Sequence, residues 1–334
     1  MATQRTDVAV VEREIADFQH TFEALRSSIG RVIVGQRPIV DAALVAIFGG
    51  GHILLEGVPG TGKTLLVRTI AKTLDLKFGR IQCTPDLMPA DVMGTHWVDE
   101  QDGRRELRFR PGPVFANLLL ADEVNRATPK TQSALLEAME ERQVTVGGET
   151  HRLSPPFVVL ATENPIEMEG TYPLPEAQLD RFMLKTLVAS PTLDELETIL
   201  DRTAGEALPE ATPLFDGARV VALQGLVRRV VLPERVRAYV ARLVEATRPD
   251  GMKPSPLVKR FVRFGASARG ALSLVLAGKV LALAQGRPHV AREDVRAMAH
   301  ATLRHRVLLN FEGEAEGVGV ESVLDEVLAH VGPG

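Results

Sequence analysis

The sequence predicts an α/β core, in which helices cover both faces of a mostly parallel five-stranded sheet, followed by a smaller all-α domain. Up to about residue 190, five short apolar segments alternate with stretches of helical periodicity. This alternation is typical of a parallel sheet buried between helices. Beyond residue 190 the strand pattern stops and helical patterns continue, broken by clusters of proline and glycine. We therefore expect two folded domains joined near that point.

The chain divides into four parts. Its 334 residues exceed the usual size of one domain. The apolar spacing of residues 8–29 predicts an amphipathic helix ahead of the core. The acid-rich end of the chain either forms a helix that covers the second domain or extends from it as an arm. We place the N-terminal helix at 1–30, the α/β core at 31–190, the all-α domain at 191–310 and the acidic tail at 311–334.

The five expected strands are short apolar runs of the kind found in buried sheets. The first run leads into a glycine-rich loop, and the third ends in two acidic residues. Because parallel strands end at the same edge of a sheet, both features are expected at one edge. We expect these strands at 53–56, 77–82, 118–122, 157–162 and 183–188.

Two hairpins are expected as insertions in the core. Asp102-Gly103 and Gly147-Gly148 are residue pairs that favour tight hairpin turns. Each pair lies between segments that are typical of short strands. We place one hairpin within residues 86–109 and the other within 143–153.

Composition indicates an ordinary globular protein of a reducing compartment. Hydrophobic residues make up 45% of the chain and charged residues 25%. Cys83 is the only cysteine, so no disulfide can form within the chain. The first residues lack the pattern of a signal peptide, and no apolar run reaches the ~20 residues of a membrane span. These features predict a cytoplasmic protein.

Charge is distributed unevenly along the chain. The net charge of −4 argues against nucleic acid as the main partner. Residues 226–310, however, contain 17 Lys and Arg against five acids. Such a region could bind nucleic acid, a phosphate-bearing partner or the acidic face of another subunit, or it could be a solvated helical surface. Few aromatic residues accompany the basic ones, which disfavours base stacking.

The loop from Gly57 to Thr64 matches the phosphate-binding pattern G-x-x-x-x-G-K-[ST] between a strand and a helix. Its glycines allow backbone N–H groups to approach phosphate oxygens at the positive end of that helix. Lys63 is expected to reach the β and γ phosphates, and the Thr64 hydroxyl to ligate Mg²⁺. We therefore predict ATP and Mg²⁺ as cofactors. The residues expected to contact nucleotide are Pro59, Gly60, Thr61, Gly62, Lys63, Thr64 and Leu65.

Asp122 and Glu123 end the third apolar run. Asp122 would share the Mg²⁺ ion with Thr64. Glu123 would orient and deprotonate the water that attacks the γ-phosphate. The alternative is a strand that ends in two solvated acids.

Two further segments give a family resemblance. The first contains Asn164 within Ala-Thr-Glu-Asn-Pro, and the second contains Arg181 within Leu-Pro-Glu-Ala-Gln-Leu-Asp-Arg-Phe. Together with the phosphate loop and the acidic pair, they closely resemble the MoxR family of AAA+ ATPases, over about residues 34–306. The resemblance implies a P-loop AAA+ core followed by an all-α lid domain.

The resemblance also implies roles for three polar residues. Asn164 would be the sensor-1 residue, which helps Glu123 to hold water or contacts the γ-phosphate. Arg181 would be the arginine finger that projects toward ATP held by the adjacent subunit. Arg269 would be the sensor-2 arginine, which reports the γ-phosphate to the lid. The local alternatives are an Asn-Pro turn for Asn164, a surface pair with Asp180 for Arg181 and a solvated lid position for Arg269.

Other features of the family map onto this chain less tightly. Gly35 and Gln36 would lie against the adenine base. Asn125-Arg126 would relay the nucleotide state to the two hairpins, which in relatives contact substrate at the ring pore or its axial surface. Ala268 stands where many relatives carry proline, which leaves the rigidity of the turn before Arg269 open.

The function implied by the resemblance is that of a chaperone-like ATPase that remodels partner proteins. The family works as a ring, expected to be hexameric, on partners that contain a von Willebrand factor A domain, often in metal insertion or complex maturation. Two alternatives stay open from the residues alone. One is an AAA+ nucleic-acid translocase, and the other is an assembly switch that binds ATP with little turnover.

Overall fold

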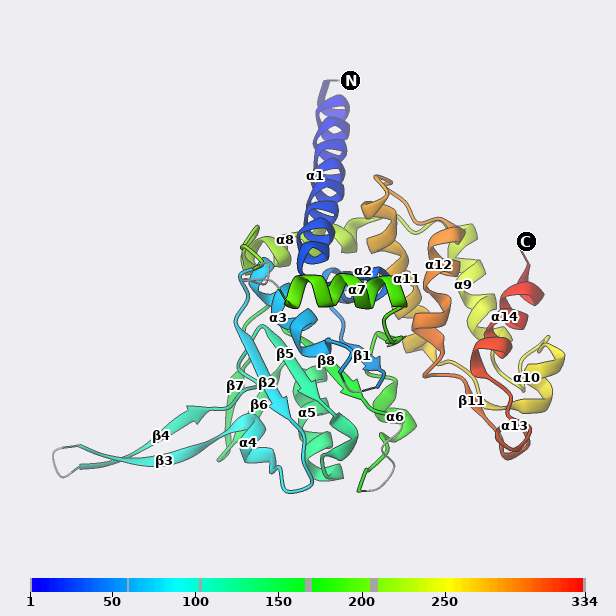
Figure 1. Cartoon of the computed structure of the whole chain (residues 1–334). Helices are drawn as coiled ribbons and strands as arrows, with labels where there is room; N and C mark the ends of the chain where they lie inside the picture. Colours follow the sequence, from blue (N-terminus) through cyan, green and yellow to red (C-terminus); the bar gives the residue numbers. More distant parts are fainter. Residues whose placement is uncertain (1, 59, 102–103, 166–169, 205–209, 333–334) are drawn as a thin grey trace.

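The computed structural model describes residues 2–58, 60–101, 104–165, 170–204 and 210–332. Its centre is a five-stranded sheet with the order β2-β5-β8-β1-β9, in which all neighbouring strands are parallel (Figure 1). The five strands predicted from the sequence are confirmed, and every strand end agrees to within one residue. Their bounds are β1 (Ile53–Glu56), β2 (Phe78–Gln82), β5 (Leu118–Asp122), β8 (Val158–Glu163) and β9 (Leu184–Leu187).

Helices cover both faces of this sheet because its strands are apolar on both sides. In β1, Ile53 and Leu55 face one buried cluster, whereas Leu54 faces a second. The first cluster includes α1 (Ala2–Val32), α2 (Arg37–Gly49) and α3 (Lys63–Thr73). The second is closed mainly by α5 (Pro129–Glu141), with α4 (Pro89–Met93) beside it.

The N-terminal helix is fixed at its C-terminal end. Phe18 and Phe22 are buried. The Phe18 ring packs edge-on against the Phe48 ring of α2, with 5.2 Å between the ring centroids. The first turns of α1 project away from the body of the molecule (Figure 1).

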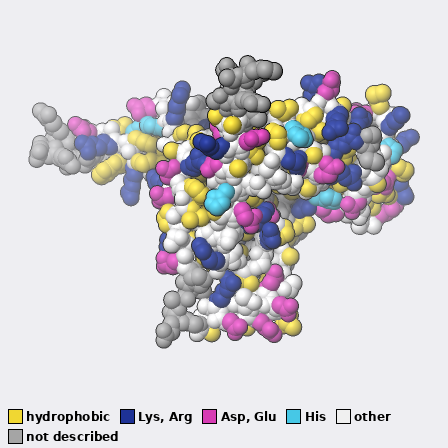
Figure 2. Space-filling model, turned by 90° about the horizontal axis from the view of Figure 1, so that it is seen from above, with side chains coloured by type: hydrophobic (Ala, Val, Ile, Leu, Met, Phe, Trp, Pro, Cys, Tyr) yellow, Lys and Arg dark blue, Asp and Glu magenta, His cyan; other side chains and the backbone are white. Residues whose placement is uncertain are grey.

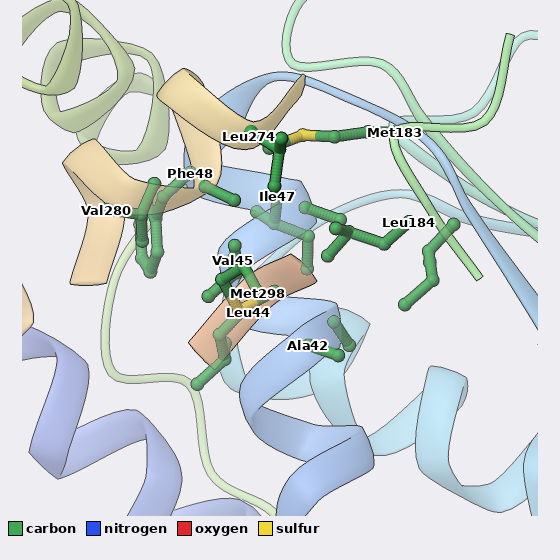
Figure 3. Close-up of a cluster of buried hydrophobic side chains, with 14 of the residues drawn as sticks. Ala42, Leu44, Val45, Ile47, Phe48, Met183, Leu184, Leu274, Val280 and Met298 are labelled. Atoms are coloured by element: carbon green, nitrogen blue, oxygen red, sulfur yellow. The ribbon is translucent and has the colours of Figure 1, made fainter. Parts of the chain in front are cut away.

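The lid packs on the core through α2, which is apolar on all sides and buried along most of its length. In Figure 3, Ile47 of α2 lies near Met183 and Leu184 of the core and Leu274 of the lid, and Phe48 lies near Val280 of the lid. The lid helices are α8 (Gly217–Arg229), α9 (Glu234–Ala246), α10 (Pro256–Phe261), α11 (Ala268–Ala284) and α12 (Arg292–Leu303).

This domain is helical, as predicted, apart from one pair of very short strands. Strand β10 (Val262–Phe264) pairs antiparallel with β11 (Leu308–Leu309). The two strands are only three and two residues long, so neither gives a periodic signal, and their pairing depends on contacts distant in sequence.

The acidic end of the chain belongs to the lid and is not a separate arm. It forms α13 (Phe311–Ala315) and α14 (Val320–Val331), and α14 buries Val323 and Val327 against the lid. Its acids also pair with lid cations, since Arg260 lies 2.7 Å from Glu312. Figure 2 shows acidic side chains among the Lys and Arg side chains over the lid. The basic stretch of sequence is therefore partly neutralised within the chain.

Both predicted hairpins are present. The first, β3 (Gly94–Gln101) with β4 (Arg104–Pro111), extends away from the core (Figure 1); its expected turn, Asp102-Gly103, lies outside the described residues. The second is β6 (Gln143–Val146) with β7 (Glu149–Arg152). Gly147 and Gly148 join its strands with φ values of 61° and 85°, a left-handed turn that favours glycine.

Three short elements complete the chain. A 3₁₀ turn, η1 (Val124–Arg126), follows β5, and α6 (Glu176–Leu179) precedes β9. Helix α7 (Leu193–Thr203) connects the core to the lid and lies across the outside of the core (Figure 1). In the described part of the chain, no helix is both long and apolar enough to cross a membrane.

Candidate nucleotide-binding site

Three loops that carry predicted site residues meet at the carboxyl edge of the sheet. The phosphate loop follows β1, Asn164 follows β8, and Asp122 and Glu123 end β5. Strand β8 lies between β1 and β5, so Asn164 separates the phosphate loop from the two acids. This is the edge at which ligands bind in parallel α/β sheets.

The phosphate loop is shaped by its glycines and by its own lysine. Gly60 and Gly62 have φ values of 81° and 77°, which L side chains adopt at a cost. The Lys63 ammonium donates to the carbonyls of Gly57 (2.5 Å) and Val58 (3.1 Å). Burial lowers the pKa of Lys63, and the nearby carboxylates of Asp122 and Glu123 partly oppose this shift. Lys63 and both acids therefore share one electrostatic site. Pro59 lies outside the described residues.

A cavity of about 400 Å³ opens beside the phosphate loop. The loop residues Gly60, Thr61 and Gly62 line it together with Leu65 in the first turn of α3. Val32, Ile33, Val34 and Gln36 form one wall, and α7 forms another with Glu195, Ile199, Arg202 and Thr203. An apolar chamber that opens onto a phosphate loop has the form needed for the base and sugar of a nucleotide.

Gln36 and Gly35, which are expected near the adenine base, have further neighbours in the structure. Gln36 lines the cavity, and its amide donates to the Thr61 carbonyl at 2.7 Å, so it also holds the phosphate loop. Gly35 is not among the residues that line the cavity. Its φ is 63°, and a Cβ at this position would overlap the Glu195 carboxylate. The positive φ is what favours glycine there, because the flexible Glu195 side chain could move aside.

The acidic pair is held by neighbours that the sequence motifs did not reveal. The Thr162 hydroxyl on β8 donates to Asp122 at 2.7 Å and accepts from the Glu123 backbone N–H at 2.8 Å. Arg80 on β2 donates to the other Asp122 oxygen at 2.8 Å. Thr162 and Arg80 both lie on strands next to β5, so only the strand order could have identified them.

Glu123 has an unusual backbone for its residue type. Its φ and ψ are 55° and 52°, in the left-handed region that non-glycine residues rarely occupy. Gln82 and Arg126 hold its carboxylate, each at 3.2 Å. Glu123 thus stands where the chain leaves β5 and enters the 3₁₀ turn, with its carboxylate fixed at the edge of the sheet.

The donors at this edge suit Mg²⁺. Thr64 offers a hydroxyl in the first turn of α3, and Asp122 a carboxylate. In the described residues, no group of three or more His, Cys, Asp or Glu could hold a metal ion. Few protein oxygen ligands, with the remaining positions left to phosphate and water, are typical of Mg²⁺ bound with a nucleotide.

Asn164 and Glu163 lie at the end of β8. Asn164 is buried, and its carbonyl accepts a 3.5 Å hydrogen bond from the Asn125 amide. Burial raises the pKa of Glu163, while Lys185 opposes the shift and Glu56 adds to it. A buried amide between the phosphate loop and Glu123 can orient a water molecule or a phosphate oxygen.

Arg181 and Arg269 lie at the opposite edge of the sheet. Arg181 precedes β9, and the Met183 N–H donates to the carbonyl of His52, which precedes β1. The phosphate loop follows β1, whose four residues span roughly 13 Å. Neither arginine lines the cavity beside the phosphate loop. The structure therefore does not bring Arg269 to the phosphate loop of its own chain.

One carboxylate joins the two arginines. Glu140 near the end of α5 lies 3.0 Å from Arg181 and accepts a hydrogen bond from Arg269. All three line a groove of about 240 Å³, together with Leu272 and Leu276 of α11. The arrangement gathers two guanidinium groups, from the core and the lid, on one face.

A buried ion pair fixes the lid to the loop that carries Arg181. Arg306 is 5% exposed and donates to Asp180 at 2.6 Å and to the Phe182 carbonyl at 2.7 Å. The Ser267 hydroxyl donates to the same Asp180 at 2.9 Å. The lid helix that begins next to Ser267 carries Arg269, so this pair sets the position of both arginines.

Comparison with known proteins agrees with this architecture. Residues 52–184 match the family described as "ATPase family associated with various cellular activities (AAA)". Residues 255–327 match the AAA lid domain. The lid match extends through most of α14, consistent with the packing of the acidic end against the lid.

Full-length relatives are also found. The chain is 44% identical to "Chaperone MoxR1" of Mycobacterium tuberculosis, over 93% of this chain and 82% of the relative. It is 31% identical to "Protein MoxR" of Methylorubrum extorquens, over 88% and 90%. A crystal structure from Cytophaga hutchinsonii, of a protein assigned as an ATPase, is 40% identical with a TM-score of 0.90, over 97% of this chain and 98% of that one.

Proposed function

Because the chain belongs to the MoxR family of AAA+ ATPases, we propose that it hydrolyses ATP in a Mg²⁺-dependent reaction at the contact between neighbouring subunits of a ring. One observation carries this proposal. The phosphate loop and the pair Arg181 and Arg269 lie at opposite edges of one parallel sheet. A subunit therefore has two halves of a site that cannot meet within one chain, but that meet when subunits pack head to tail.

Each half supplies a different part of the chemistry. Lys63 and the backbone of the phosphate loop bind the phosphates, Thr64 and Asp122 hold Mg²⁺, and bound Mg²⁺ neutralises charge on the phosphate oxygens. Glu123 takes the proton of the attacking water.

The remaining groups act on the γ-phosphate. Asn164 orients the water or a γ-phosphate oxygen. Arg181 and Arg269 of the neighbouring subunit stabilise the charge of the transition state. In this scheme sensor 2 acts on the neighbour's nucleotide, since Arg269 and Arg181 pair with the same acid, Glu140 of α5.

A mixing experiment tests the shared site. Lys63→Ala removes the phosphate-binding lysine and leaves the arginine edge intact, whereas Arg181→Ala does the reverse. Each variant alone should be inactive, with Arg181→Ala slowed about 10³–10⁵-fold. Mixed in equal amounts before assembly, they should regain activity, since roughly one quarter of interfaces in a randomly mixed ring combine two intact halves. If the mixture stays as inactive as its components, or if Arg181→Ala keeps wild-type turnover, the proposal is wrong.

We further propose that the ring, expected to be hexameric, remodels partner proteins. The name "Chaperone MoxR1" of one relative supports this role, and the long β3–β4 hairpin offers a projecting surface for a partner. The expected partners contain a von Willebrand factor A domain, with metal insertion or complex maturation as the outcome. Glu123→Gln should trap ATP, so the assembled variant can capture its partner from native lysate for identification. Capture that does not depend on ATP would contradict this role.

A further inference from the structure

Helix α7 presents three different faces to its surroundings. Glu195, Ile199 and Arg202 point into the cavity beside the phosphate loop. Leu193, Leu196 and Leu200 repeat at the same helical spacing on a second face, here called the leucine face. None of these three leucines lines the cavity. The helix therefore separates the cavity from an apolar surface on its outer side.

The leucine face is open in the single chain. Leu193, Leu196 and Leu200 are 71%, 43% and 58% exposed, and α7 has no buried side chain. Single exposed leucines are ordinary on protein surfaces. Three on one face of an 11-residue helix form an amphipathic stripe, which is the pattern of a helix that packs against something.

Acidic residues flank the leucine face. Asp194, Glu197 and Asp201 are exposed and share a third face of α7. Within the described part of the chain, none of them forms an ion pair. The outer surface of α7 is therefore apolar and negatively charged, and it suits a partner surface that is apolar and positively charged.

The arginine edge of the same protein has these properties. Leu272 lies one turn after Arg269 on α11 and is 64% exposed. Together with Leu276 and Met183 it lines the groove that contains Arg181 and Arg269. Arg142 lies in the same groove and, among the described residues, donates to the Gly50 carbonyl and to no carboxylate.

We propose that the leucine face of α7 docks on the groove around Leu272 of the next subunit in the ring. This inference rests on the proposed function, because that function brings the arginine edge of one subunit to the phosphate loop of another. Since α7 also walls the nucleotide cavity, its outer face borders the contact that the shared site requires. The bound nucleotide then positions α7, and α7 holds the neighbour that delivers the two arginines.

The docking of the leucine face is tested by measuring subunit assembly in a variant that does not hydrolyse ATP. In a Glu123→Gln background with ATP, the double change Leu196→Asp and Leu200→Asp should weaken association at least tenfold, about 1.4 kcal/mol. Sedimentation velocity over a range of subunit concentrations measures this shift. Met252→Asp is the matched control, because Met252 is 90% exposed on the lid and away from both surfaces. The binding of a fluorescent ADP analogue to the unassembled subunit should stay unchanged, which shows that the cavity is intact.

Cross-linking tests which surface lies against α7. In a Cys83→Ala background, subunits with Leu200→Cys and subunits with Leu272→Cys are mixed and treated with a short bismaleimide. In the presence of ATP, the reagent should cross-link this mixture into a covalent dimer. A mixture of Leu200→Cys and Met252→Cys subunits should give no covalent dimer. If α7 variants assemble with wild-type affinity, or if assembled subunits give no Leu200–Leu272 product, the docking inference fails while the shared site stands. If the Glu123→Gln protein remains monomeric in the presence of ATP, the proposal that the subunits form a ring is wrong.

Discussion

The Glu140 carboxylate lies 3.0 Å from the Arg181 guanidinium, and its other oxygen accepts a hydrogen bond from Arg269. Arg181 comes from the loop before β9, and Arg269 from the first turn of α11. One acid on α5 thus holds two cations that lie 88 positions apart in the sequence. A shared counter-ion keeps both guanidinium groups on the face that would meet a neighbour's phosphate.

Replacing this acid should slow hydrolysis without unfolding the protein. Glu140→Gln removes the charge that holds the arginines together, so we expect kcat of the assembled enzyme to fall roughly threefold to tenfold through loss of positioning. Because the side chains are partly exposed, unfolding free energy should change by less than about 1 kcal/mol. ATPase assays at saturating ATP and urea denaturation measure the two effects. Glu141→Gln on the same helix is the control, and equal kcat for both variants would exclude a positioning role for Glu140.

Thr162 should matter for turnover and little for nucleotide affinity. Thr162→Val preserves the shape of the side chain but removes the hydroxyl that joins Asp122 to the Glu123 backbone. We expect kcat to fall about 10–100-fold, the usual effect of removing a group that orients catalytic ligands. Binding of a fluorescent ADP analogue should be nearly unchanged. Thr186→Val, a buried threonine on β9, serves as control; a loss of ADP affinity that matched the loss of kcat would argue against this role.

Stability should fall in mild acid because of His52. The backbone N–H of Val159 donates to Nδ1, and Nε2 lies 3.1 Å from the Met139 carbonyl, so the buried ring is neutral. Burial lowers the pKa of His52 from 6.5 to about 4. As pH falls, His52 therefore binds a proton in the unfolded chain before it does so in the folded protein. The contribution of neutral His52 to stability is present above pH 6.5 and is lost as pH falls toward 4.

The size of this loss is about 3 kcal/mol from His52 alone. His52→Gln, which does not titrate, should reduce the fall in unfolding free energy between pH 6.5 and 4 by that amount. His305 is also buried with a lowered pKa, so a smaller dependence on pH should remain. Urea denaturation at intervals of pH provides the measurement. Parallel pH profiles for wild type and variant would contradict the assignment.

Arg306 should be essential for the position of the lid. Arg306→Met leaves Asp180 with only the Ser267 hydroxyl among the partners described above. Loss of one member of a buried pair costs about 3–5 kcal/mol, so we expect a loss of that size in urea denaturation. Arg260→Met removes an exposed pair with Glu312 and should cost less than about 1 kcal/mol. Similar losses for both variants would show that the Arg306 pair is not a buried clamp.

The sequence predicts the strands well because they are short apolar runs bounded by turn residues. The phosphate loop and the Asp122-Glu123 pair are also readable, since each is a local motif next to a strand. Thr162 and Arg80 could not be read in this way. They reach Asp122 from neighbouring strands, and the strand order is not encoded in any local pattern. The short β10–β11 pair escaped detection for the same reason.

The sequence by itself determined the family, through its resemblance, and the fold class, through the alternation of apolar runs and helical patterns. It also predicted the candidate residues of the phosphate loop, because they form one local motif. Only the tertiary structure decided where the arginine half lies. The parallel sheet places Arg181 at the amino edge, and the packing of the lid on α2 brings Arg269 to the same carboxylate, Glu140. The physical reason is that residues before a parallel strand lie at one edge of the sheet and residues after it lie at the other, so in the proposed ring the two groups of residues would face different neighbours.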